Sequence, residues 1–319
     1  MHPKFVIIDR QRAFIPSCNV SWEPWLEGCV EITGDTVSSL LSFYTRTWGD
    51  TPSYEQPHGS QVHKGRMFDA QQAGLASIQS TAHYQTALGA LGTLLTFVLP
   101  SSHHRNPQFR PFPWQSCPTP PATPLNVAVL QLFEQAQRSI YIQTPNLTCE
   151  AVIAALLDAL RRGVDVTIVT NRNMMLLEQL VTAGTTTSWS IKALVRRFHR
   201  LKPAPDAHRD LEAGRPAVGH LRISCFRARC QAGSGGHERR PLIAAAAVHG
   251  EEPVHSHLKL TIVDGEYTML GSGNMDRASW MTSQELGVLF HDRQFCVGVK
   301  TGVDQVLEGR LDLVFDSEG

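Results

Sequence analysis

The sequence has no excess of charge of either sign. Its 319 residues include 29 Lys and Arg and 29 Asp and Glu, so the formal net charge at pH 7 is zero. Proteins that bind nucleic acid over a broad surface usually carry a basic excess. We therefore do not expect nucleic acid as the partner, although a local basic cleft is compatible with this balance.

Long apolar runs and a leader sequence are also missing. The longest apolar stretch, residues 87–99, is shorter than the ~20 residues that a membrane-spanning helix needs. We expect a core strand or helix there. No secretory signal peptide is visible, because the one short apolar run near the N-terminus has charges on both sides. We expect a soluble, intracellular chain that contacts membranes only peripherally.

Cysteine is scarce and unpatterned. The seven cysteines form no CxxC pair and show no spacing typical of a metal site. An odd, scattered set in a chain of this size predicts reduced, buried thiols rather than a disulfide framework.

The second half of the chain alternates strand and helix patterns. Apolar residues recur there at helical spacing or in short β-branched runs. Such an alternation predicts a parallel βαβ unit and an α/β fold. The expected helices cover 35–48, 125–137, 149–162 and, with a break near Gly184, 174–200. The expected strands cover 4–9, 13–15, 139–144, 164–170, 219–226 and a hairpin over 257–271 that turns at Asp264 and Gly265.

A proline-rich segment divides the chain. Seven prolines fall within residues 101–124, a composition typical of an extended linker. We therefore predict a first domain over 1–100, with an irregular stretch at 49–85, and a second domain over 125–319. Residues 227–254 are of low complexity and are expected to form a surface insertion.

One segment of 18 residues occurs twice. Residues 2–19 and 257–274 align without a gap and agree at six positions. Five of the six are polar, whereas an accidental repeat would more often match small or apolar residues, so a duplication is the natural interpretation. The matching pairs are His2/His257, Lys4/Lys259, Ile7/Ile262, Asp9/Asp264, Ser17/Ser272 and Asn19/Asn274.

The spacing within each copy brings reactive side chains together. Residues i and i+2 of a strand point to the same side, so the His and Lys of each copy face one cleft, and the returning strand brings Ser and Asn to it. Two copies would place two imidazoles on opposite sides of one phosphate. One His can attack phosphorus and form a phosphohistidine, while the other protonates the leaving oxygen and then activates water or an alcohol. The Lys and Asn side chains would stabilise the phosphoryl oxygens without a metal.

Other polar residues have candidate roles beside these. A carboxylate bonded to the far ring nitrogen can fix the tautomer of a His, and Glu27 and Glu285, shortly after the two copies, are the candidates. Ser17 and Ser272 are expected to cap or tighten turns. Three polar residues at the end of an expected strand fit ligand binding and strand termination equally well: Gln143, Thr144 and Asn146.

The two copies resemble the signature of the phospholipase D superfamily, HxKxxxxDxxxxxxGSxN. The second copy matches it in full, and the first departs once, with Pro16 in place of a glycine that we take for a turn residue. Residues 275–285 resemble the tail that follows the motif in bacterial cardiolipin synthases. The positions carrying that tail are Asp276, Arg277, Ser279 and Glu285, and a further family pattern falls on Trp25, Gly34, Val37, Leu40 and Trp48. The resemblance leaves out only 49–100 and 227–254.

The resemblance implies a fold and a mechanism. The fold would be two α/β sandwich domains related by a pseudo-twofold axis, with the active site at their interface and no metal or cofactor. His2 would be the nucleophile and His257 the general acid. Asp9 and Asp264 belong to the motif, and both also fit a structural role in which they close a hairpin by bonding backbone amides.

The resemblance also frames the function. We expect a cardiolipin synthase-like enzyme that acts on a phospholipid with water or an alcohol as the acceptor. A nuclease of the same superfamily and an inactive scaffold are the alternatives. One residue precedes the first motif, whereas residues 125–256 precede the second within its domain. We therefore expect the first domain to lack its N-terminal half, which makes the activity of this chain an open question.

Overall fold

The described part of the chain is built from strands and helices of a mixed fold. The computed structural model describes residues 2–19, 23–49, 94–103, 118–201, 217–228 and 253–318. The helices are α1 (Asp35–Trp48), α2 (Pro124–Gln135), α3 (Glu150–Arg161), α4 (Leu176–Ala183), α5 (Thr187–His199), α6 (Arg277–Met281) and α7 (Arg293–Leu307). The strands are β1 (Val6–Ile8), β2 (Arg12–Pro16), β3 (Trp25–Leu26), β4 (Cys29–Thr33), β5 (Leu95–Ser101), β6 (Ser139–Gln143), β7 (Asp165–Thr170), β8 (Leu221–Phe226), β9 (His255–Ser256), β10 (Leu260–Val263), β11 (Tyr267–Gly271), β12 (Glu285–His291) and β13 (Leu311–Asp316).

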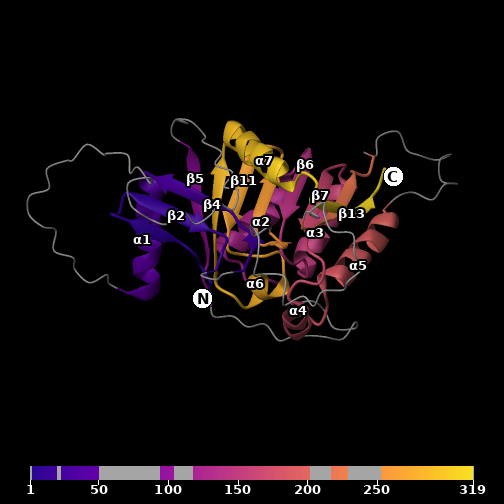
Figure 1. Ribbon diagram of the computed structural model, residues 1–319, viewed down its shortest axis with the longest axis horizontal. Coiled ribbons are helices and arrows are strands. Elements are labelled where there is room, and N and C mark those ends of the chain that lie inside the picture. The colour runs from indigo at the N-terminus through magenta and orange to yellow at the C-terminus, as the bar shows by residue number, and fades with distance from the viewer. Residues whose placement is uncertain are drawn as a thin grey trace, which may run out of the picture.

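Eight strands form one large sheet, in the order β13-β8-β7-β6-β10-β11-β12-β5. β6, β7 and β8 are parallel neighbours, and the other neighbouring pairs are antiparallel. A three-stranded antiparallel sheet, β1-β2-β4, lies at the left in Figure 1, and β3 pairs with β9 in parallel. The class is mixed α/β, as predicted, whereas the pseudo-twofold relation between two domains stays a prediction.

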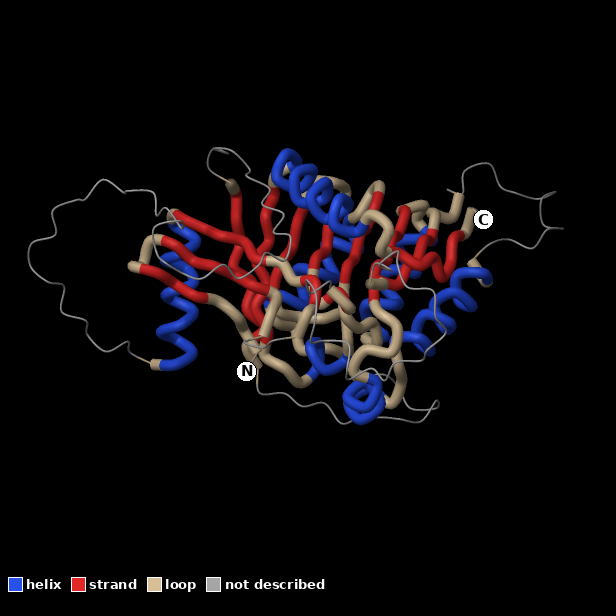
Figure 2. The backbone as a smooth tube through the Cα atoms, viewed as in Figure 1, coloured by secondary structure: helices blue, strands red, loops and turns tan. Residues whose placement is uncertain are grey.

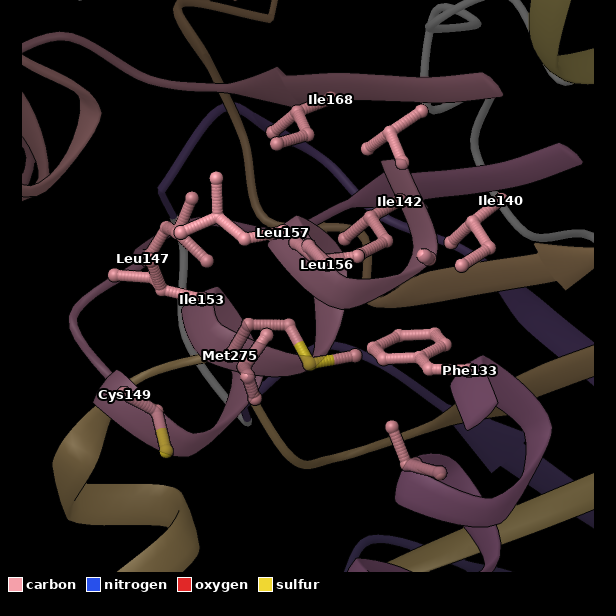
Figure 3. Close-up of a cluster of buried hydrophobic side chains, with 14 of the residues drawn as sticks. Phe133, Ile140, Ile142, Leu147, Cys149, Ile153, Leu156, Leu157, Ile168 and Met275 are labelled. Atoms are coloured by element: carbon pink, nitrogen blue, oxygen red, sulfur yellow. The ribbon is translucent and has the colours of Figure 1, made fainter. Parts of the chain in front are cut away.

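Residues 139–170 form the predicted βαβ unit. Ile140 and Ile142 of β6 point to one face because side chains alternate along a strand. Leu156 of α3 packs in the same buried cluster, and Figure 3 shows it beside Ile142. All three are at most 1% exposed, and burying each such side chain contributes about 1.5–3 kcal/mol. This layer anchors the unit on which the second motif is built.

The hairpin β10–β11 carries the second motif. It turns at Asp264 and Gly265, whose φ angles of 56° and 66° are those that the Asp-Gly pair predicts. β11 then pairs with β12, and β12 pairs with β5 at the edge of the sheet. β5 therefore completes a sheet whose other strands all follow residue 138, and the predicted boundary at residue 100 falls within this strand.

The small N-terminal sheet and α1 share an apolar core with the large sheet. Val37, Leu40 and Phe43 recur at helical spacing on one face of α1 and are buried. They belong to one cluster with side chains of β2 and β12, among them Ala13, Ile15, Leu286, Val288 and Phe290. This common core holds the first motif against the second.

Two short helices, α4 and α6, lie at the edge of the molecule where the N-terminus also lies (Figures 1 and 2). The region predicted to be helical over 174–200 contains two helices, because Gly184 ends α4 in the left-handed conformation with φ 64°. No helix in the described ranges combines the length and the apolar character needed to cross a bilayer.

Some predictions fall wholly or partly outside the described residues. These are the irregular stretch at 49–85, most of the linker and most of the insertion at 227–254. Among the cysteines within the described ranges, three are buried as predicted and two are not. The buried ones are Cys149, Cys225 and Cys296, while Cys18 is half-buried and Cys29 is exposed.

Candidate active site

Each histidine of the repeat lies against a glutamate that follows the other copy. Nδ1 of His2 is 3.0 and 3.2 Å from the two carboxylate oxygens of Glu285. Nδ1 of His257 is 2.6 Å from Oε1 of Glu27. The carboxylates thus cross between the copies, and each copy contributes the imidazole of one pair and the carboxylate of the other.

Backbone hydrogen bonds fix this crossed arrangement. The backbone N–H of His2 donates to the carbonyl of Gln284, and that of His257 donates to the carbonyl of Leu26, both at 2.8 Å. Gln284 and Leu26 each directly precede the glutamate of the pair. The main chain therefore sets the distance between each imidazole and its carboxylate before the side chains are considered.

Ser17 and Ser272 hold the two glutamates. The hydroxyl of Ser272 donates to Oε2 of Glu285 at 2.5 Å and accepts from the Leu286 N–H at 3.0 Å. The hydroxyl of Ser17 donates to Oε2 of Glu27 and accepts from the N–H of the residue after it, Gly28. Both serines are at most 4% exposed. We expected them to tighten turns, and the structure instead has them orient the carboxylates.

Each lysine of the repeat lies over its own histidine. Nζ of Lys4 is 2.9 Å from Nε2 of His2, and Nζ of Lys259 is 2.8 Å from Nε2 of His257. Lys259 also donates to the carbonyl of Ser17 at 3.2 Å, which joins the two copies once more. Each ammonium group therefore lies beside the imidazole of its own motif.

Burial disfavours the charged form of both lysines of the repeat. Loss of solvent lowers the pKa of Lys4, and the carboxylates of Glu285 and Glu27 oppose this effect. The same cause lowers the pKa of Lys259 to about 7, with Glu27 opposing. An entering phosphate favours the charged form of Lys259 by supplying an opposite charge.

The two histidines differ in accessibility. The His2 side chain is 40% exposed, whereas that of His257 is 4% exposed. The ring of Trp25, a residue of the first copy's tail, packs beside the ring of His257 with 4.9 Å between their centroids. Burial lowers the pKa of His257, and the hydrogen bond that its ring donates to Glu27 opposes the shift. His2 is therefore the more accessible of the two imidazoles.

The asparagines of the repeat are placed unequally. The Asn274 amide donates to Oδ2 of Asp276 at 3.0 Å. Its buried carbonyl oxygen has no hydrogen-bond partner within the part of the chain that the structure describes. That side chain lines a cavity of about 30 Å³ together with Lys259 and Thr144. Asn19, by contrast, is exposed.

Asp264 lies at the far end of the strand from the histidine of its motif. Its carboxylate accepts from the backbone N–H groups of Gln137, Arg138 and Ser139 at 2.7–2.9 Å. Ser139 begins β6, whereas Gln143 ends β6 and donates to Ser256 next to His257. About 13 Å of strand separates these ends. Asp264 was expected either to act in catalysis or to bond backbone amides at the hairpin, and its contacts are those of the second role. Asp9 lies exposed in the corresponding turn of the first copy, with φ 51°.

One acidic residue near the site has no signal in the sequence. Glu178 of α4 stands within an apolar run and resembles a solvated charge. Burial and the neighbouring charge of Asp276 raise the pKa of Glu178, and the charge of His2 opposes this. α4 therefore borders the site from the side of the second copy.

The sequence model of the family described as "Cardiolipin synthase, PLD-like domain" matches residues 129–306, which is more than half of the chain. The chain belongs to this phospholipase D-like family. A search of curated proteins found no match. Membership supports phosphodiesterase or phosphatidyltransferase chemistry in general.

One solved structure supports the fold, and two others are similar over part of the chain. Phosphatidylserine synthase from Haemophilus influenzae Rd KW20 is 15% identical, with a TM-score of 0.52 over 98% of this chain and 63% of that one. The chain thus spans less than two thirds of that enzyme. Nuc from Salmonella typhimurium is 17% identical, with a TM-score of 0.39 over 69% of this chain and 99% of its own. NucT from Helicobacter pylori is 14% identical, with a TM-score of 0.37 over 59% and 89%.

The geometry of the phospholipase D-like site suits paired nucleophilic and acid–base chemistry. A carboxylate on Nδ1 holds that nitrogen as the proton donor, so Nε2 carries the lone pair that can attack or accept a proton. Both histidines have this support, and both have an ammonium group within 3 Å of Nε2. The site can therefore supply a nucleophile, an acid and two cations to one phosphoryl group.

Proposed function

We propose that this chain cleaves or transfers the phosphatidyl group of a phospholipid through a covalent phosphohistidine, in the manner of a cardiolipin synthase. The observation that carries the proposal is the pair of crossed contacts, Glu285 with His2 and Glu27 with His257. They give two imidazoles that each have a carboxylate on Nδ1, and a two-step displacement at phosphorus needs one nucleophile and one acid–base group of this kind.

In the first step, Nε2 of His2 attacks phosphorus. The N–P bond forms while the bond from phosphorus to the head-group oxygen breaks, and His257 gives its proton to that oxygen. In the second step, the oxygen of water or an alcohol attacks phosphorus while His257 takes its proton, and the N–P bond breaks. Lys4 and Lys259 donate to the phosphoryl oxygens throughout. His2 is assigned as the nucleophile because it is the more exposed of the two imidazoles.

Several features favour a phospholipid over a nucleic acid. The net charge of the chain is zero, and the matching family is described by cardiolipin synthase. The tail with Asp276 and Glu285 also resembles that of cardiolipin synthases. A nucleic-acid substrate would call for a basic groove with exposed aromatic residues, which this composition supplies poorly.

The experiment uses the pure chain with phosphatidylcholine or phosphatidylglycerol, with and without added glycerol, and with single-stranded DNA in parallel; transfer to glycerol is read from phosphatidylglycerol formed out of phosphatidylcholine. We expect phosphatidate from hydrolysis, or an exchanged lipid when an alcohol is supplied. Cleavage of DNA without any lipid product would instead identify a nuclease, and inactivity on both would identify a scaffold. His291→Ala, a change at an exposed histidine of β12, serves as the control that retains activity.

A second measurement separates the roles of the histidines. A phosphatidyl ester of p-nitrophenol has a leaving group that needs no proton. His257→Asn should still form the covalent phosphatidyl-enzyme from this ester, and intact-protein mass spectrometry would detect it. His2→Asn should form none. The reverse result would exchange the two assignments.

A further inference from the structure

Helix α4 presents its apolar side chains to solvent and buries a polar one. Leu177 and Val181 are 76% and 70% exposed, and Leu176 and Leu180 are also exposed. The buried residue of this helix is Gln179. A helix on the surface of a soluble protein normally has the opposite pattern, with its apolar stripe against the core.

Hydrogen bonds of Gln179 fix this orientation. Its Nε2 donates to Oδ1 of Asn146 at 2.9 Å, and its Oε1 accepts from the N–H and the hydroxyl of Thr187 at 2.5 and 2.9 Å. The polar contacts tie α4 to the loop after β6 and to the start of α5. The helix cannot turn its leucines inward without leaving these buried groups unpaired, which is unfavourable.

The neighbouring helix α5 adds positive charge to the same region. Residues 171–201 contain five Lys and Arg and one acidic residue, which leaves a formal net charge of +4 in a chain whose total is zero. Lys192 and Arg196 of α5 are exposed and share a helix face with Trp189, which is 56% exposed. We call the outer residues of the two helices the α4–α5 surface: Leu176, Leu177, Leu180, Val181, Trp189, Lys192 and Arg196.

The α4–α5 surface borders the active site. The Arg277 guanidinium of α6 donates to the carbonyl of Thr182 in α4 at 2.9 Å. Asp276, at the start of α6, accepts from the amide of Asn274. Figure 1 shows α4 and α6 at the same edge of the molecule as the N-terminus. An extended flat surface that binds the α4–α5 surface would therefore also lie close to the candidate active site.

We propose that the α4–α5 surface docks the enzyme on a bilayer that contains anionic phospholipid. This inference rests on the proposed function and names the surface by which the site reaches its substrate. Leucine, valine and tryptophan side chains partition into the boundary between head groups and acyl chains, and Lys and Arg bind anionic head groups beside them. The cations favour a lipid surface over a second copy of this chain, because two identical basic surfaces repel one another.

The test measures binding of the full chain to phosphatidylcholine vesicles with and without phosphatidylglycerol, by flotation. We expect binding that requires phosphatidylglycerol and weakens with salt. Leu177→Ser with Val181→Ser should weaken it about tenfold or more, and Lys192→Glu with Arg196→Glu should remove its dependence on anionic lipid. Val297→Ser and Arg46→Glu, at exposed positions of α7 and α1, are the matched controls and should bind as wild type.

Turnover separates this inference from the proposed function. The Leu177→Ser, Val181→Ser variant should lose activity on vesicles to the same extent as binding, and keep it within about twofold on short-chain phosphatidylglycerol dissolved as monomers. If the wild-type enzyme binds vesicles but turns over neither the vesicle lipid nor the short-chain lipid, the proposed function is refuted and the docking surface is still supported. Unchanged vesicle binding by both double variants would overturn the docking surface. A wild-type dimer in sedimentation that this leucine–valine variant dissociates would overturn it as well, and would assign the surface to a second copy.

Discussion

Glu285 lies 3.0 Å from Nδ1 of His2, although 283 residues separate them in the chain. The equivalent contact joins Glu27 to His257 at 2.6 Å. A catalytic imidazole thus depends on a carboxylate from the other copy of the motif. This reciprocity leads to the first prediction.

Glu27→Gln and Glu285→Gln should each lower kcat roughly 100-fold or more, because an amide cannot stabilise the imidazolium as a carboxylate does. The crossed pairing predicts different responses to the leaving group. Glu27→Gln impairs His257, so the p-nitrophenyl ester should restore most of its first-step rate. Glu285→Gln impairs the nucleophile and should stay slow on either ester. Glu134→Gln, an exposed change on α2, is the control, and identical behaviour of the two site variants would contradict the pairing.

Stability of the empty enzyme should depend on pH through Lys259. Its pKa is about 7 in the folded chain and near 10.5 when unfolded, so between these values the unfolded state binds more protons and stability rises with pH. Below pH 7 the cost of burying the charge is fully present. Lys259→Met removes this cost, so its gain in unfolding free energy over wild type should be largest below pH 7 and shrink towards pH 10. Urea titrations at several pH values measure it, and Lys192→Met, at an exposed position, should show no such trend.

The pH dependence of activity should be opposite to that of stability, and both arise from Lys259. Turnover needs the protonated ammonium of Lys259, so kcat/KM for the free enzyme should fall as pH rises above about 7. Lys259→Arg keeps a cation at every accessible pH. Its lower activity should therefore lack this alkaline limb, and an unchanged limb would assign the titration to another group.

Asp264→Ala should destabilise the fold without a specific loss of catalysis. The change removes three hydrogen bonds to backbone N–H groups at 2.7–2.9 Å, and we expect a cost of about 2–4 kcal/mol in unfolding free energy. At a temperature where the variant is folded, kcat should stay within a few-fold of wild type. Asp158→Ala, which breaks an exposed pair with Arg161, should cost less than about 1 kcal/mol. A large fall in kcat for the folded variant would return Asp264 to the catalytic set.

Gly271→Ala should be far more harmful than Gly273→Ala. A Cβ at residue 271 would lie 2.3 Å from the carbonyl oxygen of Leu286, whereas one at residue 273 meets ordinary contacts at 3.6 Å. The first change must push β11 from β12 and with it Ser272 from Glu285. We expect a loss of more than about 2 kcal/mol and of most activity, against near-wild-type behaviour for Gly273→Ala. Equal melting temperatures of the two variants would contradict this.

Local patterns predicted the elements well where apolar spacing was regular. The helix expected over 35–48 and the strands of the βαβ unit occur within one or two residues of their expected bounds. The expectation that the motif glycine is a turn residue was wrong: Gly271 lies in β11, where close approach of a neighbouring carbonyl excludes a side chain. The apolar pattern predicted no elements beyond residue 285, so β12, α7 and β13 were not predicted.

Long-range contacts could not be predicted from the sequence, and the reason is physical. The pairing of β5 with β12 depends on which edge of the sheet remains free after the other strands have formed it. The spacing of residues along the chain contains no information about that edge. The sequence supplied both glutamates as partners for the histidines but not the crossing, because both assignments place a carboxylate shortly after a motif. The leucines of α4 face solvent because Gln179 makes buried hydrogen bonds on the opposite side of the helix. Helical spacing of apolar residues does not predict such contacts.

The apolar cluster that joins α1 to β12 has a consequence for how the enzyme loses activity. Leu40 and Leu286 belong to one core, and Leu286 directly follows the glutamate that serves His2. Separating the two motif-bearing parts would dismantle both histidine–glutamate pairs in the same event. Inactivation by heat or urea should therefore be concerted with the opening of this core, with no half-active species, and neither motif would carry a rudimentary activity if excised alone.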